Sequence, residues 1–253
     1  MKIFHRLVIG FIGAAFFLSS KAAAFEIETA IGGTFLNPVG QISYNGISLD
    51  LKNDLKYEKV STFTGRIKLD LPLVLPNIYI TAMPLRFAET GSKNVSFQFG
   101  NQTFTAGVPF TSSLKLDHYD ATLFYGIPFI ETATAEKLKV QVGLNLRLID
   151  FKAEINQTQT GLSESKSLVV PVPQAYLFLE IAPIEKIKIS TDLKGIIYGD
   201  SRFYDASLLL KYQLLKFFFL GGGYKYENIR VAHNGVRTDF EFGGPALEIG
   251  FIF

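Results

Sequence analysis

Apolar and polar residues alternate along most of the chain from Phe25 to Phe253 with a period of two. This period is typical of β-strands whose two faces meet different surroundings. The clearest case is 138–148, where Leu and Val occupy the even positions and Lys, Gln, Gly, Asn and Arg occupy the odd ones. A stretch of this length is about what a tilted strand needs to cross a membrane. The pattern predicts ten strands, at 25–36, 58–71, 77–89, 112–127, 138–154, 167–182, 187–198, 202–213, 216–230 and 240–253.

The connections between these predicted strands alternate in length. The short ones are 72–76, 128–137, 183–186 and 214–215, and the longer ones are 37–57, 90–111, 155–166 and 231–239. The connection 199–201 is short although its place in the order falls on the long-loop side. Outer-membrane barrels have short periplasmic turns and longer outer loops. The predicted fold class is therefore all-β, a closed antiparallel transmembrane β-barrel of about ten strands, with eight or twelve strands as alternatives.

A soluble β-sandwich also alternates apolar and polar faces, so three further features are needed to favour the barrel. The predicted strands are longer than the five or six residues usual in soluble sheets. Aromatic residues lie near the strand ends, where barrels carry an aromatic girdle: Tyr119, Tyr125, Phe129, Tyr204, Tyr212, Tyr224 and Tyr226. The chain also ends on an aromatic strand whose last residue is Phe253. A terminal Phe resembles the signal by which the barrel-assembly machinery recognises outer-membrane proteins, so we expect that machinery as a partner.

The first 24 residues have the features of a secretory signal peptide. Lys2, His5 and Arg6 form a basic start, 7–18 is apolar or small throughout, and 22–24 is a run of alanines suited to cleavage. The apolar run is too short to span a bilayer as a helix. The predicted organisation is a signal peptide at 1–24 and one outer-membrane barrel domain at 25–253, located in the outer membrane of a Gram-negative bacterium.

Composition excludes several other classes of function. The chain contains no cysteine, which rules out disulfides, thiolate metal ligands and cysteine nucleophiles. Of its 25 basic residues, three lie in the predicted signal peptide, so 22 basic and 23 acidic residues remain in the mature chain. Without a basic surplus, nucleic-acid binding is not expected. The sequence carries no phosphate-binding loop, dinucleotide fingerprint, nucleophile elbow or zinc motif, so no cofactor or metal is expected either.

Three stretches carry a resemblance to a known family. They are 47–55 (ISLDLKNDL), 116–129 (LDHYD followed by YGIPF) and 195–206 (GIIYGD followed by YDA). They resemble a family of bacterial outer-membrane β-barrel proteins to which no activity is assigned, and the resemblance extends over most of the mature chain. It implies the location and architecture described above. No functional residue is carried over from it.

The sharpest candidate for chemistry is the pair His118 and Asp120, which share one face of a predicted strand. The neighbouring alternation turns that face toward the lumen. A carboxylate that orients an imidazole can make a general base, and outer-membrane omptin proteases and lipid A deacylases use His in this way. However, no Ser is clearly paired with His118, and the omptin pattern of acidic pairs is not recognisable. A structural hydrogen-bond pair in the lumen is the preferred interpretation, and we do not expect an enzyme.

Charged side chains on the inward faces form the second feature. Two interpretations compete, a charged conduit for small solutes and a lumen filled by interlocked salt bridges. Barrels near eight strands are filled by their side chains, whereas open channels appear at about sixteen, which favours the filled lumen. The predicted lumen-facing polar residues are Arg66, Lys68, Asp70, Lys139, Arg147, Lys188, Asp192, Lys194, Asp205, Lys211 and Glu248.

Taken together, these patterns predict a porin-like barrel with a filled polar lumen and a structural or surface-interaction role. Its surroundings would be outer-membrane lipids and lipopolysaccharide, and the loops 37–57 and 90–111 would contact an unidentified external ligand. Loop 90–111 has an alternation of its own, which predicts a small hairpin above the barrel or folded into it. A narrow channel or small-solute transporter is the first alternative, and an envelope enzyme acting on lipid A or peptides is the second.

Overall fold

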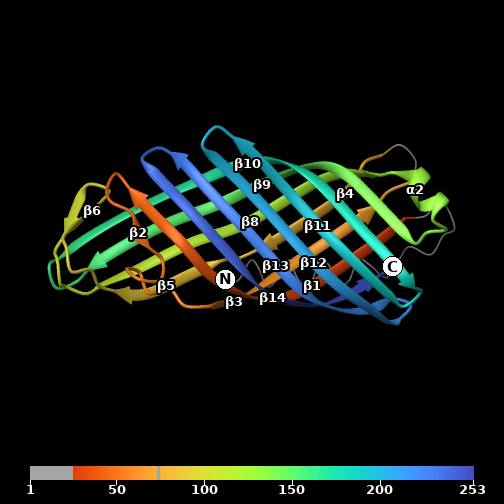
Figure 1. Cartoon of the computed structure of the whole chain (residues 1–253), viewed down its shortest axis with the longest axis horizontal. Helices are drawn as coiled ribbons and strands as arrows, with labels where there is room; N and C mark the ends of the chain where they lie inside the picture. The colour runs from red at the N-terminus through yellow and green to blue at the C-terminus, as the bar shows by residue number, and fades with distance from the viewer. Residues whose placement is uncertain (1–24, 73–74) are drawn as a thin grey trace, which may run out of the picture.

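The computed structural model describes residues 25–72 and 75–253, so the predicted signal peptide lies outside the described residues. Within these ranges ten strands form one closed antiparallel barrel, in which each strand pairs with the next and β14 pairs with β1 (Figure 1). The predicted ten-stranded barrel is therefore confirmed. The barrel strands are β1 (Glu26–Tyr44), β3 (Val60–Asp70), β4 (Asn77–Met83), β8 (Phe110–Gly126), β9 (Leu138–Gln157), β10 (Leu162–Ile184), β11 (Ile187–Tyr198), β12 (Ser201–Leu215), β13 (Phe218–His233) and β14 (Val236–Ile252).

Several strands continue beyond their predicted ends. β9 and β10 pair without interruption from Ile181 opposite Leu138 to Leu162 opposite Gln157. The predicted long loops 155–166 and 231–239 therefore shrink to tight turns. The second of these turns places Asn234 and Gly235 at positive φ, the conformation that Asn-Gly hairpin turns favour.

The connection 128–137, predicted as a simple turn, contains a short helix, α2 (Pro128–Ala133). No helix among the described residues is long and apolar enough to cross a membrane. α2 lies at one end of the barrel and the segment around β6 at the other (Figure 1). We call these the lower end and the upper end.

The predicted strand 77–89 is interrupted at Pro84, which has no N–H to donate. It forms β4 and a separate strand, β5 (Arg86–Gly91), and both pair with β8. The backbone N–H at the break is not lost, because Leu85 donates to Asp117 Oδ1 at 3.1 Å. β3 pairs with β4 but not with β5 among the described residues, so the wall opens above Pro84.

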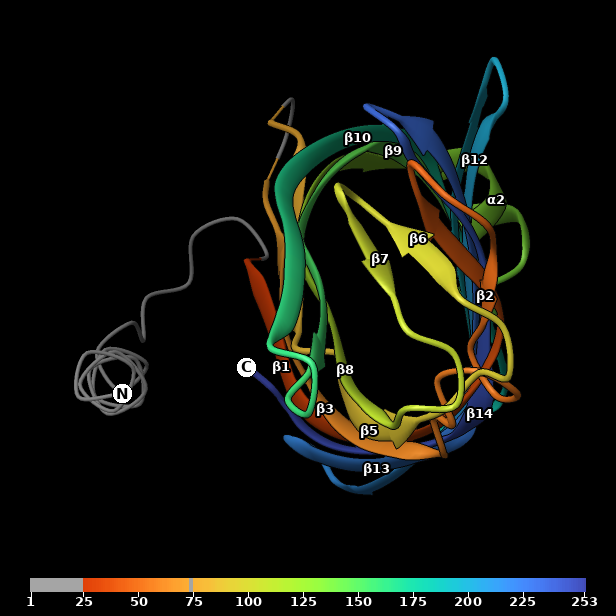
Figure 2. The same cartoon turned by 90° about the vertical axis from the view of Figure 1, so that its left-hand side faces the viewer.

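The hairpin predicted within 90–111 is present as β6 (Phe97–Phe99) and β7 (Gln102–Phe104). It lies across the upper mouth of the barrel (Figure 2). Phe97, Phe99 and Phe104 are each at most 2% exposed, so the hairpin is folded into the barrel rather than standing above it. A further short strand, β2 (Leu49–Asp50), pairs with the upper part of β1.

The two faces of the wall exchange character halfway along the barrel, as β9 shows. Below Ile149 the outward side chains are apolar, and Leu144 is 73% exposed. Above it the outward side chains are polar, including Lys152 and Glu154, while Phe151 points inward at 5% exposure. We call the part of the barrel up to Leu148 on β9 the lower half and the part beyond it the upper half. The predicted polar lumen is present only in the lower half, and the upper half has an apolar interior.

Candidate functional site

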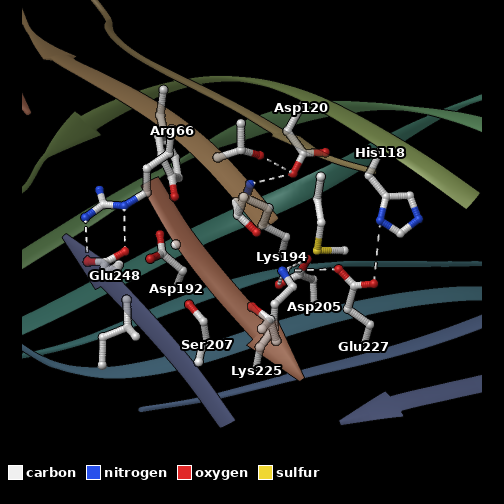
Figure 3. Close-up of a pocket in the computed structure, with 18 of the residues that line it drawn as sticks. Arg66, His118, Asp120, Asp192, Lys194, Asp205, Ser207, Lys225, Glu227 and Glu248 are labelled. Atoms are coloured by element: carbon white, nitrogen blue, oxygen red, sulfur yellow. Dashed lines mark hydrogen bonds and ion pairs between the residues drawn. The ribbon is translucent and has the colours of Figure 1, made fainter. Parts of the chain in front are cut away.

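The interior of the lower half is a network of buried charges (Figure 3). At its centre Arg147 on β9 is 3% exposed. Its guanidinium donates to Asp120 Oδ1 and Oδ2 at 2.7 and 2.8 Å and to Asp205 Oδ2 at 2.5 Å. Lys194 Nζ lies 2.7 Å from Asp120 Oδ2. These four side chains come from β8, β9, β11 and β12, so the network joins strands that lie far apart in the sequence.

Lys225 extends this network to β13. Its Nζ lies 3.1 Å from Asp205 Oδ2 and 3.1 Å from Glu227 Oε1. Asp120, Asp205 and Glu227 thus face Arg147, Lys194 and Lys225, three acidic against three basic groups. Burial of a charge is costly unless it is paired, and here each charge has an opposite partner.

A second network lies nearer the lower end. Arg66 donates to Glu248 through two bonds of 2.8 and 3.0 Å, and its Nη2 lies 2.5 Å from Glu28 Oε1. Lys211 Nζ lies 3.0 Å from the same Glu28 oxygen. Lys188 lies 3.4 Å from Glu180 at the rim, where its side chain is 36% exposed. This network also holds equal numbers of basic and acidic groups, with Arg66, Lys188 and Lys211 against Glu28, Glu180 and Glu248.

Aromatic rings and amides complete the lower interior. Lys68 Nζ lies 3.8 Å from the centroid of the Phe178 ring and donates to Gln141 Oε1 at 2.6 Å. Such cation–π contacts stabilise a buried ammonium group. Tyr176 donates to Asp192 at 3.0 Å. Polar and aromatic side chains therefore fill the lumen together.

The remaining predicted lumen residues form the lower mouth. Lys139 Nζ lies 2.7 Å from Asp70 Oδ2, and both side chains remain partly exposed. The structure therefore brings the predicted polar residues into one interior and pairs most of them with one another. Glu28, Glu180, Lys225 and Glu227 complete the two networks. None of these four is in the list of predicted lumen-facing residues, although the spacing of two between Lys225 and Glu227 places both on one face.

The suggested pairing of His118 with Asp120 is wrong. The oxygens of Asp120 accept bonds from Arg147, Lys194 and Thr81 instead. His118 Nδ1 faces Glu227 Oε2 at 3.6 Å, which is beyond hydrogen-bond distance (Figure 3). His118 is 2% exposed, and neither ring nitrogen has a hydrogen-bond partner among the described residues.

A small cavity lies between the two networks. Its volume is about 80 Å³, and its lining includes His118, Glu227, Arg66 and Met83. A water molecule needs about 10–15 Å³ of such volume, so the cavity has room for a few waters that could bond to the buried polar groups. Among the described residues no group of His, Asp and Glu side chains is arranged to hold a metal ion.

The upper interior has the opposite chemistry. Apolar side chains from β1, β5, β8, β9, β13, β14 and the loop segment around Leu51 and Tyr57 form one buried cluster. Burial raises the pKa of the Tyr57 phenol above its usual range, because the charged form would lose its hydration. The alternation does carry a signal for this core, since Ile149, Phe151 and Ile155 occupy the odd positions that are polar farther down β9.

Comparison with solved structures supports the architecture. The outer membrane protease OmpT from Escherichia coli matches with a TM-score of 0.52 at 11% identity, covering 93% of this chain and 100% of that one. The fold is that of a bacterial outer-membrane β-barrel. The attachment invasion locus protein Ail of Yersinia pestis matches at 14% identity, with a TM-score of 0.39 and coverage of 90% and 99%. The translocator domain of the autotransporter NalP from Neisseria meningitidis matches at 11% identity, with a TM-score of 0.43 and coverage of 98% and 95%.

No protein-family model and no curated protein matches the sequence. At these identities the likeness to solved structures concerns the fold.

Proposed function

We propose that the protein is an integral outer-membrane barrel whose lumen is closed and whose upper half acts outside the membrane as an interaction surface. Its outward apolar belt supports the membrane position. On β9 this belt runs from Leu138 to Leu148, which at a tilt of about 45° rises by about 25 Å, the height of the apolar band of such barrels. On β9 the outward side chains above the belt are polar, as expected for a surface in water.

The observation that carries the proposal is a row of aromatic rings within the apolar core that fills the upper lumen. Tyr57, Phe87 and Phe242 stack with centroid distances of 5.5 and 5.7 Å, and Phe240 continues the row at 5.8 Å. Phe87 is on β5 and Phe240 and Phe242 are on β14, two strands that β3 and β1 separate around the barrel, and the row belongs to the buried apolar cluster of the upper interior. A close-packed apolar core offers no hydrated path for ions or polar solutes.

The alternatives receive less support. A channel would have to cross this core, and the cavity in the lower half lies beneath it. An enzyme using His118 would need substrate to reach a side chain that is 2% exposed. The networks in the lower half balance their own charges, which suits a structural role in holding the wall together.

The residue proposed as the assembly signal, Phe253, lies where β14 meets β1. Phe253 donates its backbone N–H to the Ile27 carbonyl at 2.9 Å, while its side chain is 57% exposed. The terminal strand therefore closes the barrel against β1 and still presents an aromatic ring outside. In the proposal the barrel-assembly machinery recognises this ring, and outer-membrane lipids and lipopolysaccharide surround the belt.

Bilayer conductance of the refolded mature protein tests the closed lumen. We expect no stepwise current with the unaltered protein, because the aromatic row blocks the path. The double variant Phe87→Ala with Phe242→Ala is the matched positive control, since it removes two rings from the row. Discrete conductance steps from the unaltered protein would contradict the proposal and favour the channel.

A further inference from the structure

The upper part of β10 is an open strand edge. β10 pairs with β9 along its length but with β11 only from Ala175 onward, so the segment 162–174 has one strand partner in the described part of the chain. The inward side chains of Leu162, Leu168 and Val170 are only half-buried, whereas Phe151 and Ile155 on the neighbouring β9 are buried. The open edge therefore leaves both backbone groups and apolar surface accessible.

The direction of each backbone N–H follows from a single hydrogen bond. Ala182 donates its N–H to the Lys137 carbonyl on the β9 side. Because this direction alternates along a strand, the even residues of β10 face β9 and the odd residues face the open side. Pro171 and Pro173 are odd and have no N–H, which explains why pairing with β11 stops there. Farther up, the N–H groups of Ser163, Ser165 and Ser167 point to the open side.

The upper half has a second open strand edge, along β5, and the loop segment that contains Asp54 and Tyr57 covers it. Tyr57 stacks on Phe87 of β5, and Asp54 accepts a bond of 2.7 Å from Lys93 just beyond that strand. The backbone edge of 162–170 has no second strand partner in the described part of the chain, although on the inward face Lys166 Nζ lies 5.2 Å from the centroid of the Tyr44 ring and β10 contacts β7. Exposed edges with free donors and acceptors pair readily with another strand.

The sequence of this edge is complementary to itself. Residues 162–168 read LSESKSL, which is symmetric about Ser165 except that Glu164 is exchanged for Lys166. If two copies pair antiparallel about Ser165, Glu164 of each lies opposite Lys166 of the other, and Leu162 lies opposite Leu168. This register joins opposite charges across the strands, covers the half-buried leucines and forms about six backbone hydrogen bonds.

We infer that a second copy of this chain occupies the β10 edge, forming a continuous sheet from one upper half to the other; this rests on the proposed function, which places the upper half outside the membrane. Copies in one membrane share an orientation, so their β10 strands would run in the same vertical direction. Antiparallel pairing therefore joins copies in two facing membranes, or copies free to reorient in detergent. The protein acts as a contact between facing surfaces.

Cysteine cross-linking tests the register, and the chain contains no native cysteine to interfere. In the proposed register Ser165 of one copy lies directly opposite Ser165 of the other. Two Ser165→Cys residues would therefore have Cα atoms about 5.5 Å apart, within disulfide range. Two Ser163→Cys residues would be about 14 Å apart, since they lie on different strands and are offset by four residues along them. We expect Ser165→Cys to form disulfide dimers in detergent and Ser163→Cys to stay monomeric alone but to cross-link to Ser167→Cys. Heat-modifiable gel mobility shows that each variant is folded.

Vesicle clustering tests the contact between membranes. Vesicles of phosphatidylcholine and phosphatidylglycerol that carry the unaltered protein should cluster, as followed by light scattering. Those carrying Glu164→Lys or Lys166→Glu alone should not, because like charges then face each other. Mixing the two variant populations should restore clustering.

Two results would overturn the pairing. One is a folded, non-conducting Ser165→Cys protein that stays monomeric, and the other is equal cross-linking of Ser163→Cys and Ser165→Cys by themselves. Neither result would contradict the proposed closed barrel. Conductance of the unaltered protein would instead overturn the proposed function, whatever the cross-links show.

Discussion

Phe87 on β5 and Phe242 on β14 stack inside the upper lumen with their centroids 5.7 Å apart and their planes 14° from parallel. Both are at most 5% exposed. The two strands do not hydrogen-bond to each other among the described residues, and β3 and β1 separate them around the barrel. The contact is therefore a side-chain bridge between two strands that the backbone hydrogen bonds do not join directly.

Loss of one ring from this bridge should destabilise the protein. We expect Phe242→Ala to lower the free energy of unfolding by about 3–5 kcal/mol, since it leaves a cavity in a close-packed core. A double-mutant cycle with Phe87→Ala should show a coupling of about 0.5–1.5 kcal/mol. Urea unfolding in detergent measures both quantities. Phe63→Ala is the control, because Phe63 is 60% exposed on the outside of β3 and should show no coupling to Phe87.

The exchange of faces along β9 gives a second prediction. Leu144→Arg should cost about 2–4 kcal/mol, because it places a charge on the lipid face near the bilayer midplane. Glu154→Arg lies on the same face in the upper half and should cost under about 1 kcal/mol, since it disturbs only an exposed ion pair with Lys152. The folded fraction in lipid vesicles, read from heat-modifiable mobility, measures both. Equal losses would mean that the membrane covers the upper half as well.

The same exchange explains how far the fold could be predicted. In the lower half, lipid outside and charges inside give a strong period of two, so the existence and order of ten strands follow from the sequence. Beyond Leu148 the apolar residues move to the other parity, which weakens the period of two, and the predicted strand ends at 154 although the backbone continues to Gln157. The predicted loops are too long for this reason.

The contacts inside the lumen could also be predicted only in part. Alternation assigns a residue to a face, and that was sufficient to turn Arg147 and Asp205 inward. Alternation does not give the height of a residue along the barrel axis relative to residues on distant strands. The contact between Arg147 and Asp205, which are 58 positions apart, could therefore not be predicted. Asp120 illustrates the consequence. Its face followed from the pattern, but its partners are two cations on other strands rather than the histidine beside it.

Arg147 should be the most sensitive residue of the lower interior. Arg147→Ala leaves the buried carboxylates of Asp120 and Asp205 without their shared partner, and breaking such a pair costs about 3–5 kcal/mol. Arg147→Lys keeps the charge but cannot donate to both carboxylates with the same geometry, so an intermediate loss is expected. Urea unfolding measures the three proteins. A loss for Arg147→Ala no greater than that for Lys188→Ala at the exposed rim would contradict the buried network.

His118 provides the last prediction, which separates a structural from a catalytic role. Because neither ring nitrogen has a partner among the described residues, His118→Ala should cost mainly packing, and less than Arg147→Ala. No activity should depend on it, since the ring lies below the apolar core. Lipid A from cells with and without the protein, compared by mass spectrometry, tests the deacylase alternative, and a peptide-library digest tests the protease alternative. We expect no difference in either assay. A product that disappears in a folded His118→Ala barrel would establish an enzyme and require a route for substrate past Phe87 and Phe242.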